Sequence, residues 1–279
     1  MATLLAKIQD TYNFIFYDLC DDRTRDLFPT HIHMLIILPT YLYFVKRLGP
    51  RIMQNLQPFE LKTPIMLYNI FQICISFYIF VLGLAAGWLN HYDITCQPVD
   101  YTENIYSRRM LNGFWWYTTV KLIDLMDTIF FVLRKKDRQI SFLHVFHHFM
   151  MPIASYIGLK YFPNGHSSLL GIINSFVHVI MYTYYLIAGL GPKYQKYIWW
   201  KQHVTTLQLV QFAIIFVHNV IPIFKECAYP KWINVLLAIH SLQFVYLFGS
   251  FYYETYIKTP QKKTKSSTAN GTSKKVKAN

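Results

Sequence analysis

Apolar residues are gathered into long stretches along this chain, and polar residues fill the short gaps between the stretches. A stretch of about 20 apolar residues is enough to cross the hydrocarbon core of a bilayer as an α-helix. The pattern therefore predicts an all-α, polytopic membrane protein with seven transmembrane helices. We place these helices at Phe28–Val45, Pro64–Trp88, Gly113–Leu133, Phe142–Leu159, Ser167–Leu190, Val204–Ile223 and Ile233–Tyr253.

Composition also favours a membrane bundle over soluble domains. Hydrophobic residues make up 53% and charged residues 15% of the 279 positions, whereas a soluble protein carries about 25% charged residues. A formal net charge of +13 would suit nucleic-acid binding, but seven basic residues lie in the last 22 positions and most others flank apolar stretches. A membrane-orientation signal explains this distribution better, so we expect membrane lipid and no nucleic acid as a partner.

The positions of Lys and Arg predict which side of the membrane each loop occupies. With seven spans, 18 of the 27 basic residues fall on the side of the carboxyl terminus and 8 on the other side, while Lys121 lies inside a span. Because loops rich in Lys and Arg face the cytosol, we expect a lumenal amino terminus and a cytosolic carboxyl terminus. The first 26 residues contain no apolar core of signal-peptide length, so the first span is expected to act as the targeting signal.

This topology divides the chain into three regions. Residues 1–27 form a lumenal amino-terminal segment, residues 28–258 form the membrane domain, and residues 259–279 form a basic cytosolic tail that we expect to be disordered. Lys275 and Lys277 occupy the fifth and third positions from the carboxyl terminus. This arrangement resembles the dilysine signal that returns membrane proteins to the endoplasmic reticulum, and we expect that location.

The cysteines divide according to the same topology. Cys96 and Cys227 both lie in loops assigned to the lumen, where an oxidising environment allows a disulfide between them. Two free thiols are the alternative. Cys20 has no obvious partner, and Cys74 lies inside a span, where we expect it to pack against neighbouring helices.

Ionisable side chains inside a span are costly, and each therefore indicates a functional site. In the third span Lys121, Asp124, Asp127 and Thr128 lie within about a third of the helix circumference. Lys121 and Asp124 are three residues apart and can form an ion pair. A buried ion pair that only joins helices is the alternative.

The fourth span begins with an HxxHH box formed by His144, His147 and His148. The i, i+3, i+4 spacing places the three imidazoles on one face of the helix. One buried histidine could simply be hydrogen-bonded to a carbonyl, whereas three on one face indicate a reactive or metal-binding site.

Polar side chains also recur along one face of each of the next two spans. In the fifth span these are Asn174, His178, Met181, Tyr182 and Tyr185; in the sixth they are Thr205, Gln208 and Gln211. The first stripe suits a tunnel wall, with an ordinary aromatic core as the alternative, and the second could instead join helices through amide hydrogen bonds. All four clusters lie near the midplane or on its cytosolic side, which predicts one polar chamber open to the cytosol.

Two kinds of chemistry fit a cluster of histidines. Iron is bound by histidines in membrane desaturases and hydroxylases, but these need several His boxes and this chain has one. Acyl transfer needs a nucleophile or base, which His147 and His178 could supply, with Asp124 or Asp127 orienting an imidazole. Basic residues near Arg134 and Lys201 would then hold the phosphates of a CoA thioester. A non-enzymatic seven-span receptor or transporter is the remaining alternative.

The four clusters resemble the signature boxes of the ELO family, the very-long-chain fatty acid elongases, in order and in spacing. The matching patterns are Lys121-x-x-Asp124-x-x-Asp127-Thr128, the HxxHH box, Asn174-x-x-x-His178-x-x-Met181-Tyr182-x-Tyr184-Tyr185 and Thr205-x-x-Gln208-x-x-Gln211. The resemblance covers nearly all of the membrane domain. One position departs from the family pattern, because Asp124 stands where Glu is usual, which weakens a direct catalytic role there.

The resemblance implies a fold and a reaction. Six of the seven helices would form a barrel around an acyl tunnel, and the enzyme would condense malonyl-CoA with a long-chain acyl-CoA. His147 would accept the acyl group, His178 would lie close to the reacting carbon, and His144, His148 and Asp127 would support them. The tunnel wall would bind substrate through Lys121, Asp124, Arg134, Asn174, Tyr182, Tyr185, Lys201, Gln208 and Gln211. No cofactor is implied. The reductase, dehydratase and enoyl reductase of the elongation cycle would be partners, and a homodimer is left open.

Overall fold

The computed structural model describes residues 2–89, 91–197 and 199–258. Within these ranges the regular structure is entirely helical and contains no β-strand, which confirms the predicted all-α class. Lys275 and Lys277, with the tail that carries them, lie outside the described residues.

Each of the seven predicted apolar stretches lies on one helix or on consecutive helices; η marks a 3₁₀ or π segment. The order is α1 (Ala2–Asn13), η1 (Phe14–Asp18), α2 (His31–Tyr43), η2 (Phe44–Leu48), α3 (Gly49–Met53), α4 (Lys62–Gly83), η3 (Leu84–Trp88), α5 (Ile105–Ile123), α6 (Leu125–Leu133), η4 (Asp137–Gln139), α7 (Phe142–Tyr161), α8 (Ser168–Gly189), η5 (Pro192–Tyr197), α9 (Lys201–Val220), η6 (Ile221–Ile223), α10 (Lys231–Tyr252) and η7 (Tyr253–Lys258).

Several of these helices are suited to a bilayer. In the part of the chain that the structure describes, four helical segments are long and apolar enough to cross a membrane. They are Lys62–Trp88, Ser168–Gly189, Lys201–Ile223 and Lys231–Lys258. The chain is therefore a multi-pass membrane protein.

The third predicted stretch differs from the structure at its start and in its middle. Helix α5 begins before the apolar stretch does, because the Asn104 side chain accepts hydrogen bonds from the backbone N–H groups of Tyr106 (2.9 Å) and Ser107 (2.8 Å). This is an N-cap, which satisfies donors that the first helical turn leaves free. The helix then breaks at Asp124, so that α5 and α6 meet inside the predicted polar cluster.

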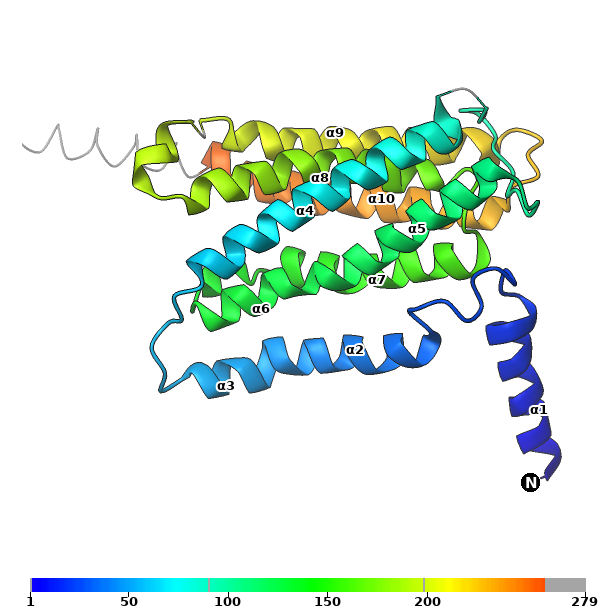
Figure 1. The fold of residues 1–279 in the computed structure, drawn as a ribbon, viewed down its shortest axis with the longest axis horizontal. Coiled ribbons are helices and arrows are strands. Elements are labelled where there is room, and N and C mark those ends of the chain that lie inside the picture. Colours follow the sequence, from blue (N-terminus) through cyan, green and yellow to red (C-terminus); the bar gives the residue numbers. More distant parts are fainter. Residues whose placement is uncertain (1, 90, 198, 259–279) are drawn as a thin grey trace, which may run out of the picture.

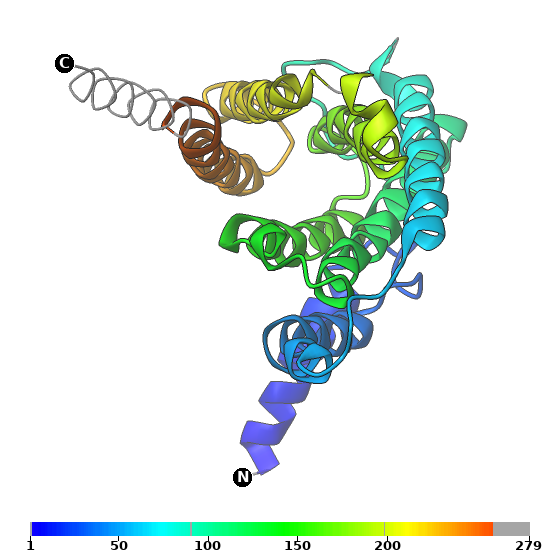
Figure 2. The same cartoon turned by 90° about the vertical axis from the view of Figure 1, so that its left-hand side faces the viewer.

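The long helices lie along one common direction (Figure 1). Seen along that direction, α7, α5, α4, α8, α9 and α10 follow one another around an arc, which we call the ring (Figure 2). Helices α7 and α10 meet through aromatic side chains, with the ring centroids of Phe146 and His147 lying 6.1 Å and 5.1 Å from that of Phe244. Helix α2 lies outside the ring, where Leu38 and Tyr41 share a buried cluster with α7.

The two ends of the ring differ in chemistry. We call one the disulfide end, because Cys96 and Cys227 form a disulfide there between the loops that precede α5 and α10, with Cα atoms 5.7 Å apart. This is the pairing expected from the sequence. We call the other the basic end, after the loop of residues 134–138. Cys74 does not pack in the core as expected, because α4 turns Gln72 and Ser76 inward and leaves Cys74 exposed.

At the disulfide end, a buried lysine ties the segment before α2 to the ring. Lys160, near the end of α7, is 1% exposed, and its Nζ donates to the backbone carbonyl oxygens of Thr24, Arg25 and Leu27. Arg23 in the same segment donates to Asp21 and to Ser107 Oγ on α5. These bonds fix the residues that lead into α2.

Candidate active site

The predicted ion pair is present where α5 ends. Lys121 Nζ lies 3.0 Å from Asp124 Oδ2, and the two side chains are 2% and 4% exposed. The cation also lies over the Tyr117 ring, 5.0 Å from its centroid. A buried charge pair of this kind needs further hydrogen bonds to offset the loss of hydration. The Asp124 carboxylate accepts such hydrogen bonds from side chains of α4 and α8.

Two residues of α4 complete the surroundings of Asp124, and neither was identified from the sequence. Gln72 Nε2 donates to Asp124 Oδ1 at 2.8 Å and to the Tyr68 hydroxyl at 3.0 Å. Gln72 is completely buried. The usable signal was their spacing, since two polar side chains four residues apart share one face of an otherwise apolar helix.

Tyr182 of α8 bridges the two carboxylates of the cluster. Its hydroxyl lies 3.1 Å from Asp124 Oδ1 and 2.9 Å from Asp127 Oδ2. One hydroxyl hydrogen can serve only one of these acceptors at a time. The Tyr68 hydroxyl, 3.4 Å away, extends the network to α4. Helices α4, α5, α6 and α8 are therefore joined by one continuous set of polar contacts.

His178 is placed one turn from Tyr182 on the same face of α8. The Lys121 ammonium lies 3.4 Å from His178 Nδ1 and 3.5 Å from Nε2, and Nδ1 is 3.9 Å from Asp124 Oδ2. Lys121 thus contacts a carboxylate on one side and an imidazole on the other. One turn further along α8, Asn174 Oδ1 accepts a hydrogen bond from the Tyr117 hydroxyl at 3.1 Å.

The first histidine of the HxxHH box is held by a hydroxyl. Ser141 caps α7 by accepting from the His144 backbone N–H at 3.2 Å, and His144 Nε2 lies 2.9 Å from Thr128 Oγ1. Thr128 in turn lies 2.8 Å from the Tyr41 hydroxyl of α2. This chain of hydroxyls connects the outer helix with the box.

The other two histidines have different surroundings. The His148 ring lies 4.2 Å from that of His144 and 5.5 Å from that of His147, between centroids. His147 faces Phe244 and Phe248 of α10, at 5.1 Å and 6.2 Å. Among the described residues, no side chain or carbonyl forms a hydrogen bond with the imidazole ring of His147. His147 and His148 lie within electrostatic range of Lys121 and His178. In the part of the chain that the structure describes, no hydrogen bond joins the box directly to His178.

The α9 stripe contributes less than the sequence predicts. Gln208 Nε2 lies 3.5 Å from Met181 Sδ, and Thr205 and Gln211 are buried. Within the described ranges, Gln211 Oε1 has no hydrogen-bond partner.

Three predicted substrate-binding residues lie at the edge of the cluster or beyond it. Tyr185 is 41% exposed, and its ring lies 5.9 Å from that of Tyr182. Arg134 follows the last residue of α6, and Lys201 is exposed at the first residue of α9, both at the basic end. Neither contacts the cluster within the described part of the chain.

Metal binding is the alternative chemistry for a cluster of histidines. In the residues that the structure describes, no three His, Cys, Asp or Glu side chains are grouped as metal ligands.

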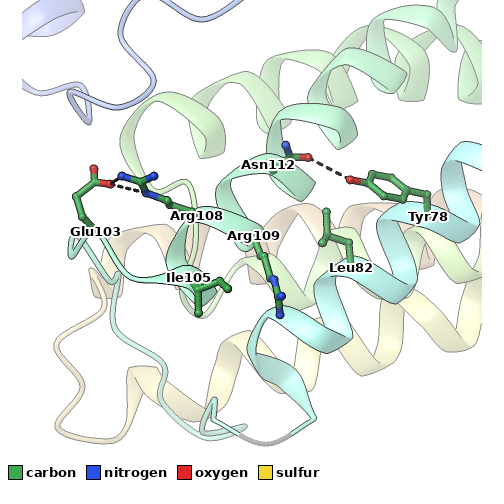
Figure 3. Close-up of a pocket in the computed structure, with 7 residues that line it drawn as sticks. All are labelled: Tyr78, Leu82, Glu103, Ile105, Arg108, Arg109 and Asn112. Carbon is green, nitrogen blue, oxygen red and sulfur yellow. Dashed lines mark hydrogen bonds and ion pairs between the residues drawn. The ribbon is translucent and has the colours of Figure 1, made fainter.

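A groove of about 580 Å³ lies between α4 and the start of α5, where Arg108 pairs with Glu103 and the Tyr78 hydroxyl contacts Asn112 (Figure 3). None of its lining residues belongs to the histidine cluster, by which we mean His144, His147, His148 and His178.

The chain matches one protein family and several known proteins over most of its length. Residues 27–264 match the ELO family, described as the GNS1/SUR4 family. The chain is 40% identical to very long chain fatty acid elongase 7 of Drosophila melanogaster, over 96% of this chain and 82% of the relative. It is 43% identical to elongase 1 of Homo sapiens, over 81% of each chain, and 39% identical to human elongase 4, over 87% of this chain and 79% of the relative. The chain therefore belongs to the ELO family, as the resemblance of its boxes indicates.

Proposed function

We propose that this protein is a very-long-chain 3-oxoacyl-CoA synthase, the condensing enzyme of fatty acid elongation. The observation that carries the proposal is the contrast within the HxxHH box. His144 is engaged by Thr128, whereas His147 has no polar partner among the described residues and lies within electrostatic range of Lys121 and His178. An imidazole that is positioned but not engaged keeps its lone pair for a substrate.

In the first half-reaction, a ring nitrogen of His147 attacks the carbonyl carbon of the acyl-CoA thioester. The C–S bond breaks, and the proton lost by the imidazole goes to the CoA thiolate, so an acyl-imidazole and free CoA are formed. Phe244 and Phe248 pack against His147. Their apolar rings suit an acyl chain and keep water away from the labile acyl group.

In the second half-reaction, malonyl-CoA loses carbon dioxide and its electron pair remains on the carbon next to the thioester. That carbon attacks the acyl carbonyl and the C–N bond to His147 breaks. The released ring nitrogen takes up one proton, which regenerates the imidazole and leaves a 3-oxoacyl-CoA two carbons longer. Negative charge develops on the thioester oxygen during this step. The Lys121 ammonium beside His178, with the amides of Asn174, Gln208 and Gln211, would stabilise it. Decarboxylation supplies the driving force, so the reaction needs no cofactor.

The same proposal includes the membrane topology. Four segments qualify as spans by length and apolar content, and α2–α3, α5–α6 and α7 lie alongside them (Figure 1). We infer seven spans, six of which form a barrel around the acyl tunnel, in the ring order described above. The basic end would face the cytosol and receive the CoA phosphates near Arg134 and Lys201.

The expected cellular setting follows from the reaction. The dilysine-like ending Lys275–Lys277 supports an endoplasmic reticulum membrane. The 3-oxoacyl product must be reduced, dehydrated and reduced again, so enzymes of those three classes would act next.

A direct test uses purified protein, radiolabelled malonyl-CoA, and palmitoyl- or stearoyl-CoA. We expect labelled 3-oxoacyl-CoA with two additional carbons and release of one carbon dioxide per product. Absence of this product across acyl chain lengths would contradict the proposal, provided that the protein keeps its disulfide and unfolds in a cooperative thermal transition.

A further inference from the structure

Helix α1 stands apart from the bundle. It leaves the disulfide end crosswise to the long helices (Figure 1) and extends away from the ring when the molecule is seen along the bundle direction (Figure 2). Its 12 residues give a length of about 18 Å, whereas crossing the hydrocarbon core needs about 30 Å. Helix α1 is therefore too short to be a span, and its direction is parallel to the plane of a membrane that contains the bundle.

The helix has one apolar face and one polar face. At about 100° per residue, Leu4, Leu5, Ile8 and Tyr12 lie within an arc of about 100°. Lys7, Asp10 and Asn13 lie outside this arc. Leu4, Leu5 and Ile8 are 62%, 63% and 56% exposed, so no part of the described chain covers these three side chains. A large aliphatic side chain is less stable in water than in an apolar environment.

Contacts with α2 show which way the apolar face points. The Tyr12 hydroxyl lies 2.5 Å from His31 Nε2, and the Phe16 ring stacks on His31 at 4.5 Å. His31 is the first residue of α2, which runs from the disulfide end into the bundle. Tyr12 belongs to the apolar arc, so that arc faces the side on which α2 enters the bilayer. The Tyr161 hydroxyl of α7 donates to the Ile15 carbonyl at 3.0 Å, which links η1, the segment directly after α1, to α7.

We propose that α1 is an interfacial helix that lies on the membrane surface at the disulfide end. Leu4, Leu5 and Ile8 enter the boundary between lipid headgroups and acyl chains, while Lys7 and Asp10 remain in water. An amphipathic helix held in the membrane plane buries its apolar face in this way. The partner is the lipid surface itself, because the three exposed side chains and the first turn of α2 lie on the same side of α1.

The test measures the environment of single nitroxide labels in the full-length protein in phosphatidylcholine vesicles. Four variants, Leu5→Cys, Ile8→Cys, Lys7→Cys and Asp10→Cys, are made in a Cys20→Ser, Cys74→Ser background that keeps the disulfide. Lys7 and Asp10 are matched controls, since they lie on the same helix and face the opposite way. Retention of the disulfide and an unchanged thermal unfolding midpoint show that each variant is folded.

Labels at positions 5 and 8 are expected to collide with oxygen more than with a water-soluble nickel chelate, and labels at positions 7 and 10 are expected to show the reverse. Equal exposure of all four labels to the nickel chelate would overturn the proposal. Protection of positions 5 and 8 accompanied by dipolar coupling between labels would also overturn it, since a second copy would then cover the face. The readout needs no substrate, so it is independent of the proposed condensation.

Discussion

Lys121 and Asp124 form an ion pair at 3.0 Å that is almost fully enclosed by α4, α5 and α8. Removing one partner leaves the other charge buried without compensation. We expect Asp124→Asn to destabilise the protein by about 3–5 kcal/mol. The measurement is thermal unfolding in detergent, with Glu103→Gln as the matched control, because Glu103 and Arg108 form an exposed pair.

Two further variants separate charge from packing at the same position. Asp124→Glu keeps the charge and restores the residue usual in the family, so its stability should stay close to that of the unmodified protein. The double variant Lys121→Met, Asp124→Leu should regain stability but not activity. Normal stability of Asp124→Asn would show that the pair is not a buried charge pair.

Gln72 lies outside the four signature boxes but donates a hydrogen bond to Asp124, so we expect it to affect activity. We expect Gln72→Leu to lower kcat/KM roughly tenfold to a hundredfold, because it removes a hydrogen bond to a charged group. Tyr78→Phe, on the exposed side of the same helix, is the control and should have little effect. The assay is the labelled malonyl-CoA reaction at several substrate concentrations. Full activity of Gln72→Leu would mean that the position of Asp124 does not depend on α4.

Thr128 connects the box to the outer helix. Thr128→Val keeps the shape but removes the hydroxyl between Tyr41 and His144, so we expect a lower kcat with a loss of stability of about 1–3 kcal/mol. Thr183→Val is the matched control, since within the described residues the Thr183 hydroxyl donates to the carbonyl of Val179 in its own helix and to no other group. Equal kcat values for the two variants would remove Thr128 from the positioning of His144.

The disulfide joins loops separated by 131 residues and should stabilise the disulfide end. We expect Cys96→Ser or Cys227→Ser to lower stability by about 2–4 kcal/mol. Activity of the protein that remains folded should be nearly unchanged, because the histidine cluster does not include this end. Thermal unfolding with and without reductant measures the effect, and Cys74→Ser on the exposed face of α4 is the control. An unfolding midpoint that reductant leaves unchanged would contradict this prediction.

Helical periodicity predicted the parts of the site that lie on one helix. The Lys121–Asp124 pair and the Thr128 and HxxHH residues were identified because charges in an apolar stretch are costly and i, i+3 or i+4 spacing shares a face. The Cys96–Cys227 pair followed from assigning loops to one side of the membrane.

Contacts between distant helices were harder to predict. Tyr68 and Gln72 were missed because α4 was interpreted by its overall apolarity, and only the packing of α4 against α5 and α8 shows that Asp124 needs them. Tyr185 fits the α8 stripe by spacing and contacts the Tyr182 ring, although it is 41% exposed. Helix α1 was not recognised because its four large apolar residues are too few for a span and are interrupted by Lys7 and Asp10.

The most direct test of the central claim is mass spectrometry of the protein after incubation with stearoyl-CoA alone. We expect an acyl group on His147 that disappears when malonyl-CoA is added, together with release of a 3-oxoacyl-CoA two carbons longer. The folded His147→Ala variant should show neither adduct nor product. Condensation by His147→Ala at more than a few per cent of the normal rate, or full product formation without any adduct on the unmodified protein, would contradict the account.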